Sequence, residues 1–338
     1  MPITRTHLRK HVHRVAIQAW HWLVNTRAQA WLQSSVTGRA LVSDEELLTL
    51  LHQVQAMHAV GRRHAMQPQP GEQLSPFVGR GSDFEEARSY MPGDDLRHMD
   101  WRATARTGKP YIKVYRQERQ SVLHLVVDRG ATMRFATRGR LKVAQAARMA
   151  MLMTLDAHLM NEAVGLTLLD SGGETLRPQS GQAAIQTVID HLNRPAPPRD
   201  DSVDYLEAVN ASLADIELLA PTGARMVLLT DGRFIKSQHL ALFARLASSR
   251  EVSVVQILDV AETRLPRVGL VRWLDVVNGD MHVADGSDPE QRRRFDQAAR
   301  EWLQTIATLL EQSGVRLHQC STEEDAWAFV SRNLLHHE

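Results

Sequence analysis

Two acidic residues directly follow short apolar runs that are predicted to be strands. Asp128 follows the run 122–127, and Asp231 follows the run 226–230. In open α/β sheets, ligands collect at the edge where the carboxyl ends of parallel strands meet. Two carboxylates and a nearby hydroxyl are the oxygen ligands that a hard divalent cation needs, with water completing the shell. Alternatively, these acids cap loops by accepting hydrogen bonds from backbone N–H groups.

The elements that must position these acids alternate between strand and helix beyond residue 120. The predicted strands are 122–127, 164–169, 175–176, 225–230, 252–258 and 315–318. The predicted helices are 141–160, 181–193, 202–219, 237–249, 289–312 and 323–335. Apolar strands that alternate with helices predict an α/β fold with a mostly parallel sheet covered on both faces.

The first 66 residues are predicted to form a helical extension. Apolar residues at three- and four-residue spacing predict a helix from 5 to 35. Ser43 and Glu46 form a capping box that predicts the start of a second helix. The proline- and glycine-containing segment 67–71 breaks the helical pattern. We therefore expect an N-terminal helical extension at 1–66, a separate segment at 67–120 and the α/β domain at 121–338.

The overall composition argues against several classes of protein. The chain has 40 basic and 39 acidic residues, so its net charge of +1 does not attract it to DNA or to an acidic membrane. No stretch approaches the ~18 consecutive apolar residues of a membrane span. The single cysteine, Cys320, excludes an internal disulfide and a cysteine-rich zinc site. We expect a cytoplasmic protein with no nucleic-acid partner and no integral membrane segment.

The order of elements around the two acids resembles that of a von Willebrand A domain. A strand followed by Asp-x-x-x-Thr-Met, a long helix, a hairpin, a helix and a strand ending in Thr-Asp-Gly are the shared features. The resemblance implies a three-layer, Rossmann-like α/β domain with a metal-ion-dependent adhesion site. Asp128 matches the first aspartate of that site, Thr132 its second hydroxyl and Asp231 its distant aspartate. Ser202 is the candidate for the third motif, and Gly130 stands where the first hydroxyl is expected.

The glycine at position 130 makes this predicted site degenerate, because water must replace a protein oxygen there. Ser202 or Asp201 can instead be the N-cap of the helix that follows. Mg²⁺ is the one cofactor that the resemblance implies. If no cation binds, Arg129 and Arg233, which flank the two acids, are expected to dock a partner carboxylate beside Gly130.

Upstream of the sheet, closely spaced motifs are very similar to the signature of the DUF58 family. They occupy residues 79–84, 88–97, 100–107 and 114–119, and a further match lies at 259–266. The resemblance spans residues 71–320. It implies a bacterial, non-enzymatic adaptor that works beside a MoxR-type AAA+ ATPase in assembling, activating or inserting metal into an unknown client protein.

Arginines and acids alternate within this signature. Arg88, Arg97, Arg102 and Arg106 are able to form forked ion pairs with neighbouring carboxylates, which would fix the segment. Alternatively, these arginines and Trp101 form a partner-docking surface, because Trp and Arg are common hot-spot residues. The aromatic and basic residues also superficially suit a single nucleic-acid strand, but acids crowd the same region.

Common enzyme motifs are absent from the sequence. It has no P-loop, no Gly-x-Ser-x-Gly elbow and no His-Glu-x-x-His. We therefore expect a protein-binding adaptor that is not an enzyme. Two alternatives stay open: a metal-dependent hydrolase that uses Asp128 and Asp231, and a nucleic-acid-binding protein.

Overall fold

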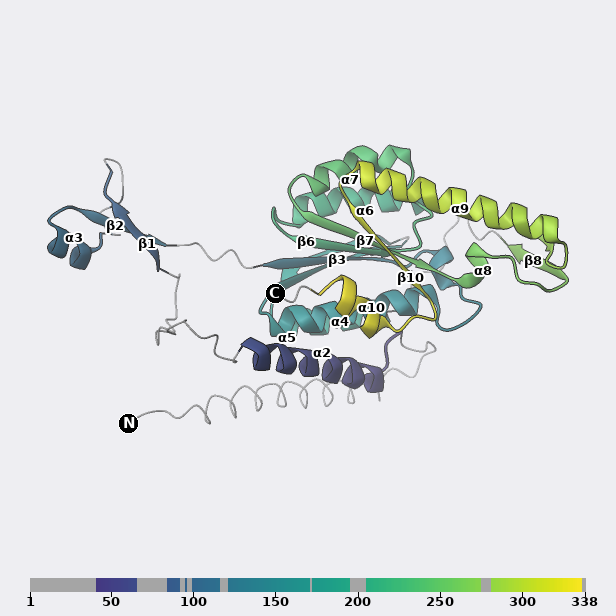
Figure 1. Ribbon diagram of the computed structural model, residues 1–338, viewed down its shortest axis with the longest axis horizontal. Coiled ribbons are helices and arrows are strands. Elements are labelled where there is room, and N and C mark those ends of the chain that lie inside the picture. Colours follow the sequence, from purple (N-terminus) through teal and green to yellow (C-terminus); the bar gives the residue numbers. More distant parts are fainter. Residues whose placement is uncertain are drawn as a thin grey trace. The chain divides into compact units, whose positions relative to one another are not determined.

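The computed structural model describes residues 41–65, 84–91, 95, 99–115, 121–170, 172–194, 205–274 and 281–335 (Figure 1). The chain divides into two compact units. One comprises Met1–Arg62 and Ser121–Glu338, and the other comprises Arg63–Gln120. Within the described part of the chain, no helix combines the length and the apolar character needed to cross a bilayer.

A six-stranded sheet lies at the centre of the larger unit, in the order β10-β7-β6-β3-β4-β5. The pairs from β10 to β4 are parallel, and β5 pairs antiparallel with β4. These strands are β3 (Val122–Asp128), β4 (Ala163–Leu169), β5 (Glu174–Gln179), β6 (Arg225–Thr230), β7 (Glu251–Leu258) and β10 (Arg316–Ser321). Almost every residue of β3, β4, β6 and β7 is buried, as expected for parallel strands that are covered on both faces. The predicted α/β fold with a mostly parallel sheet is confirmed.

Helices cover both faces of this sheet, which gives three layers (Figure 1). One face carries α2 (Asp44–Ala65), α4 (Lys142–Leu159), α5 (Gln182–Asn193) and α10 (Ala326–Asn333). The other face carries α6 (Tyr205–Leu219), α7 (Leu240–Ala247) and α9 (Pro289–Gln312). Along β3, Leu125 and Val127 belong to the first core and Val126 to the second, because successive strand side chains point to opposite faces.

Short elements occupy the connections. They are η2 (Ala131–Arg134), η3 (Ser237–His239), α8 (Val260–Thr263) and the antiparallel hairpin of β8 (Leu270–Leu274) and β9 (Met281–Asp285). Both η2 and α8 follow the carboxyl end of a sheet strand, so they contribute to the edge where the candidate site lies.

The helix predicted from the capping box begins as expected, but it is not part of a separate extension. Ser43 N donates to Glu46 Oε2, and Glu46 N donates to Ser43 Oγ, each at 3.2 Å. Leu47, Leu50 and Val54 of α2 are buried in the core formed with α4 and the sheet. The boundary at residue 66 is therefore wrong for this helix, since its apolar stripe completes the core of the larger unit. The predicted helix at 5–35 and the segment 67–71 lie outside the described residues.

The smaller unit is built from part of the signature segment. Strand β1 (Phe84–Ser89) pairs antiparallel with β2 (Tyr111–Tyr115), and α3 (Trp101–Thr107) lies in the connection between them. Asp100 caps this helix, because its Oδ1 accepts from the backbone N–H groups of Arg102 and Ala103, each at 3.0 Å. The helix ends at Gly108, whose φ of +68° is the left-handed conformation typical of glycine there.

A buried histidine sits in the middle of the sheet. His124 on β3 is fully buried, and its Nε2 lies 2.9 Å from Thr167 Oγ1. Burial, with a smaller contribution from Arg250, lowers the pKa of this imidazole to about 4. A Cβ at Gly165 would lie 2.4 Å from His124 Nδ1, so the ring occupies the space that the glycine leaves.

Candidate functional site at the carboxyl edge of the sheet

Asp128 and Asp231 meet at the carboxyl edge of the sheet, as predicted. Strands β3 and β6 are parallel neighbours in which Val127 pairs with Leu229, so the two acids follow adjacent strand ends. Thr230 Oγ1 donates to Asp128 Oδ2 at 2.6 Å and links the two ends.

Both carboxylates are buried and accept hydrogen bonds from the chain itself. Asp128 and Asp231 are each 1% exposed. The second oxygen of Asp128, Oδ1, accepts from the backbone N–H of Gly130 at 2.8 Å. Asp231 Oδ1 accepts from the N–H of Arg233 at 3.0 Å, and its Oδ2 accepts from Lys142 Nζ at 2.8 Å. The two acids are therefore engaged by the chain itself and do not form an exposed binding surface at this edge.

An acid ends or directly follows each of four neighbouring strands, and all four acids make the same local turn. Asp128, Asp170, Asp231 and Asp259 each accept a hydrogen bond from the backbone N–H two residues further on. A short polar side chain that bonds its own backbone in this way stabilises a tight turn. The structure thus supports the loop-capping alternative for Asp128 and Asp231, and the same signal was present in the sequence at the other two positions.

A buried lysine is the centre of the polar contacts at this edge. Lys142, the first residue of α4, has a side chain that is 0% exposed. Its Nζ lies 2.8 Å from Asp231 Oδ2 and 2.7 Å from Glu262 Oε1. Arg233 NH2 lies 3.0 Å from the same oxygen of Glu262 and its Nε 3.9 Å from Asp231 Oδ2. We call these four residues the Lys142 cluster; neither Lys142 nor Glu262 was among the predicted site residues.

Glu262 is held in place by the first turn of α8. The N–H of Asp259 donates to Glu262 Oε2 at 3.0 Å, which completes a capping box. Asp259 follows β7 and is fully buried. Burial opposes ionisation of its carboxyl, but hydrogen bonds from Thr137, Ala261 and Thr322 outweigh burial and lower its pKa. The Asp-x-x-Glu motif therefore fixes the position of the second carboxylate around Lys142.

The described residues do not fit the predicted Mg²⁺ site. The ammonium of Lys142 already binds Asp231 Oδ2, and donors of the chain engage both oxygens of Asp128. Gly130 is buried and offers no side-chain oxygen. Thr132 is half-buried on η2, while Ser202 lies outside the described residues. Among the residues that the structure describes, no group of three or more His, Cys, Asp or Glu side chains is arranged to hold a metal ion.

The prediction that Arg129 and Gly130 contact a partner is wrong, because both are buried. Arg129 is 2% exposed. Its NH1 donates to His191 O at 2.8 Å and its NH2 to Arg194 O at 2.6 Å. Its Nε lies 3.7 Å from Asp170 Oδ2. The guanidinium therefore satisfies backbone carbonyls at the carboxyl end of α5, where the helix itself supplies no donors.

The predicted docking residues of the smaller unit are exposed where they are described. Trp101 is 69% exposed on α3, and Arg102 and Arg106 are exposed on the same helix. Arg88 is exposed and donates to Ser89 O at 3.2 Å. Arg97 lies outside the described residues. Their role as a docking surface stays a prediction.

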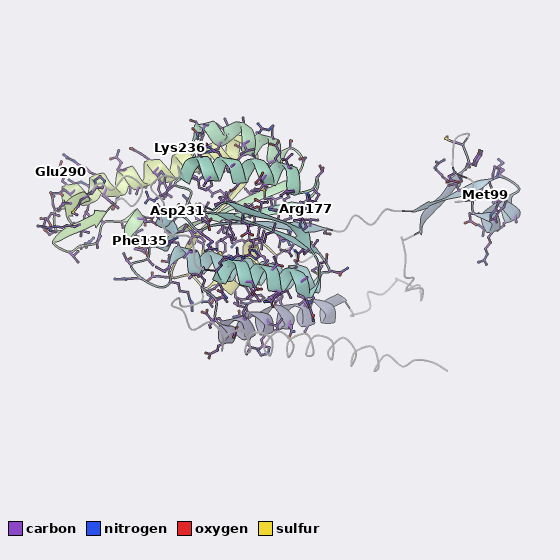
Figure 2. The ribbon with its side chains drawn as sticks, turned by 180° about the vertical axis from the view of Figure 1, so that it is seen from behind. Met99, Phe135, Arg177, Asp231, Lys236 and Glu290 are labelled. Atoms are coloured by element: carbon purple, nitrogen blue, oxygen red, sulfur yellow. The ribbon has the colours of Figure 1, made fainter. Side chains whose placement is uncertain are left out.

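Three exposed apolar side chains lie on the segments that carry the Lys142 cluster. Phe135, Leu141 and Val260 are 40%, 43% and 40% exposed. The Phe135 ring centroid lies 5.9 Å from Lys142 Nζ, and Phe135 and Asp231 lie toward the same end of the sheet (Figure 2). Arg233 is 44% exposed and its guanidinium lies 5.0 Å from the ring centroid of Trp302. We call Phe135, Leu141, Arg233 and Val260 the carboxyl-edge rim.

The rim combines the two kinds of group that recur at protein interfaces. Apolar side chains exclude water from the centre of a contact, and arginine offers a planar set of donors to a partner carboxylate. The acids, Lys142 and the loop N–H groups beneath the rim bond to one another, so they hold its loops in position.

Several solved structures are similar to parts of this chain, at low sequence identity. An aerotolerance-related membrane protein from Bacteroides fragilis is 15% identical and has a TM-score of 0.38, with 62% of this chain and 97% of that chain covered. A von Willebrand factor type A protein from Catenulispora acidiphila is 12% identical and has a TM-score of 0.29, with 58% and 42% covered.

Related sequences match a larger part of this chain than these two structures do. Uncharacterized proteins of Mycobacterium tuberculosis and Mycobacterium bovis are 28% identical over 269 residues, which cover 78% of this chain and 81% of each relative. The family model described as protein of unknown function DUF58 matches residues 86–304, more than half of the chain and including every residue of the Lys142 cluster. The chain therefore belongs to the DUF58 family.

Proposed function

We propose that this protein is a non-enzymatic adaptor whose carboxyl-edge rim binds a segment of another protein. The observation that carries the proposal is that Phe135, Leu141 and Val260 stay exposed on the segments that carry the Lys142 cluster, whose Arg233 is also exposed. The partner segment that suits this rim has an apolar side chain next to a carboxylate, because the rim combines exposed apolar side chains with the exposed guanidinium of Arg233.

A more specific form of this proposal names the proteins that the adaptor binds. The DUF58 signature implies a MoxR-type AAA+ ATPase and a client protein that is assembled, activated or loaded with metal. The exposed Trp101 and the arginines of α3 supply a second surface in the smaller unit. An adaptor with one surface on each unit would contact the ATPase and the client through different residues.

The hydrolase alternative has less support from the geometry. Catalysis would need Asp128 or Asp231 to reach a substrate or a metal-bound water. Both carboxylates are 1% exposed, and each accepts at least two hydrogen bonds from donors of the chain. Turnover by the purified protein alone would contradict the adaptor proposal.

The experiment is affinity capture of the tagged full chain with identification of bound proteins by mass spectrometry. Phe135→Ser and Arg233→Gln alter the rim, while Leu218→Ser and Arg177→Gln are matched controls. Leu218 is 83% exposed on α6 and Arg177 is exposed on β5 (Figure 2). We expect the rim variants to weaken partner binding about tenfold or more and the controls to bind normally.

The binding of a MoxR-type ATPase is measured directly with the purified proteins, in Mg²⁺ and in EDTA. The same variants are used, with Trp101→Ser to test the second surface. The proposal would be contradicted if each captured protein bound all of these variants as tightly as it binds the wild type. The variants in question are Phe135→Ser, Arg233→Gln and Trp101→Ser.

A further inference from the structure

The antiparallel hairpin of β8 and β9 has one exposed face that is largely apolar. The register pairs Arg272 with Val283. Leu270 and Met281 lie two positions from these residues on their own strands, so all four side chains point to the same face. Leu270, Met281 and Val283 are 71%, 66% and 55% exposed. Exposed apolar side chains that gather on one face are typical of a binding surface.

The other face of the hairpin is better covered, and the hairpin is tied to the helix that follows it. Val271 pairs with Ala284 on that face, and both are half-buried. Strand β9 contacts α9, and the backbone N–H of Asp285 donates to Gln291 Oε1 at 2.9 Å. The exposed face therefore belongs to a hairpin that the protein itself holds in place.

The exposed charged side chains in the described part of 264–285 are all positive. Arg264, Arg267 and Arg272 are exposed, and none of the three forms an ion pair with an acid that the structure describes. Asp285 is half-buried, and its Oδ1 accepts from the backbone N–H of Ser287 at 2.8 Å and from its hydroxyl at 2.6 Å. Charge complementarity therefore favours an acidic partner.

Strand β8 also has an edge at which a further strand can be added. Among the strands that the structure describes, β8 pairs only with β9. An extended segment that joins such an edge gains main-chain hydrogen bonds, and its alternate side chains give specificity. Leu270 and Arg272 are two positions apart on β8, so an added strand meets them with two residues that have the same spacing. A bilayer surface offers no backbone for this pairing.

We propose that β8 binds an extended segment of another protein, which adds a strand at the unpaired edge of β8. The segment places an apolar residue against Leu270 and an aspartate or glutamate against Arg272. Its recognition pattern is an apolar and an acidic residue separated by one position. This surface shares no residue with the carboxyl-edge rim, so the inference does not depend on the function proposed for the rim.

The test selects peptides from a phage-displayed library of random sequences on the purified full chain. The affinity of the selected peptides is then measured by fluorescence anisotropy. We expect Leu270→Ser and Arg272→Glu to weaken the binding of peptides with the proposed pattern about tenfold or more. Leu218→Ser and Arg177→Gln alter exposed residues of other elements and should bind these peptides as the wild type does.

An exchange of charges separates specific docking from general attraction. A selected peptide whose acid is replaced by lysine should lose its affinity for the wild type. It should regain affinity for Arg272→Glu, because the two charges then attract each other again. Phe135→Ser alters the carboxyl-edge rim and should leave the binding of these peptides unchanged.

Three outcomes would overturn the inference. The first is that the library yields no binding peptide. The second is that every selected peptide binds Leu270→Ser and Arg272→Glu as tightly as the wild type. The third is that the full chain binds vesicles that contain phosphatidylserine, that Arg272→Glu abolishes this binding, and that no selected peptide depends on Arg272.

Discussion

Replacing Lys142 by Met should strongly destabilise the larger unit. Methionine keeps an unbranched apolar side chain but removes the ammonium that contacts Asp231 at 2.8 Å and Glu262 at 2.7 Å. Asp231 is 1% exposed and the side chain of Glu262 is 8% exposed, so water cannot replace the lost donor well. Removing one partner of a buried ion pair typically costs about 3–5 kcal/mol. We expect a loss of this size, equivalent to about 10 °C in melting temperature.

The assay is urea unfolding in EDTA at neutral pH. Lys236→Met is the matched control, because Lys236 is exposed near the start of η3 (Figure 2), and it should change the free energy of unfolding by less than about 0.5 kcal/mol. A double-mutant cycle with Asp231→Asn should show coupling, since the two side chains are in contact. A loss below about 1 kcal/mol for Lys142→Met would refute the argument that Lys142 stabilises this edge.

Three further predictions concern the interior and the smaller unit. The pKa of His124 falls from 6.5 to about 4 in the folded protein, so the unfolded state binds more protons below pH 6.5. Stability should therefore fall by about 3 kcal/mol as the pH drops from 6.5 to 4, and His124→Gln should flatten this slope in urea titrations at several pH values. Gly165→Ala should lower the melting temperature by several degrees, because its Cβ would lie 2.4 Å from His124 Nδ1; an unchanged melting temperature would contradict this packing. Trp101→Ser should leave the free energy of unfolding within about 0.5 kcal/mol of the wild type, since Trp101 is 69% exposed, and circular dichroism during urea unfolding would show a larger change if Trp101 were structural.

The capping turns explain why the acids at the strand ends were predicted to be metal ligands. Asp128 and Asp231 have the residue type and the position of metal ligands, and both positions are also favourable for a side chain that bonds its own loop. The two alternatives differ in what lies next to the carboxylates in space. Lys142 is 89 positions from Asp231 and 120 positions from Glu262 along the chain, so no local pattern identified it.

The sheet and most of its helices could be predicted from the sequence because their signals are local. A buried parallel strand reads as a continuous apolar run, and the runs at 122–127 and 225–230 coincide with β3 and β6. A helix start is set by neighbouring residues, and the Ser43 and Glu46 capping box formed as expected. Whether α2 forms its own extension or joins the core depends on the apolar surface available elsewhere, and no local pattern contains that information.

The sequence by itself determined that Asp128 and Asp231 lie at one edge of a mostly parallel sheet, because strand periodicity and chain order decide where strand ends meet. The tertiary structure alone decided that these acids are buried, that Lys142 neutralises Asp231, and that Arg129 holds the end of α5. The physical reason is that the free energy of a charged group depends on its neighbours and its burial, which folding brings together from distant parts of the chain.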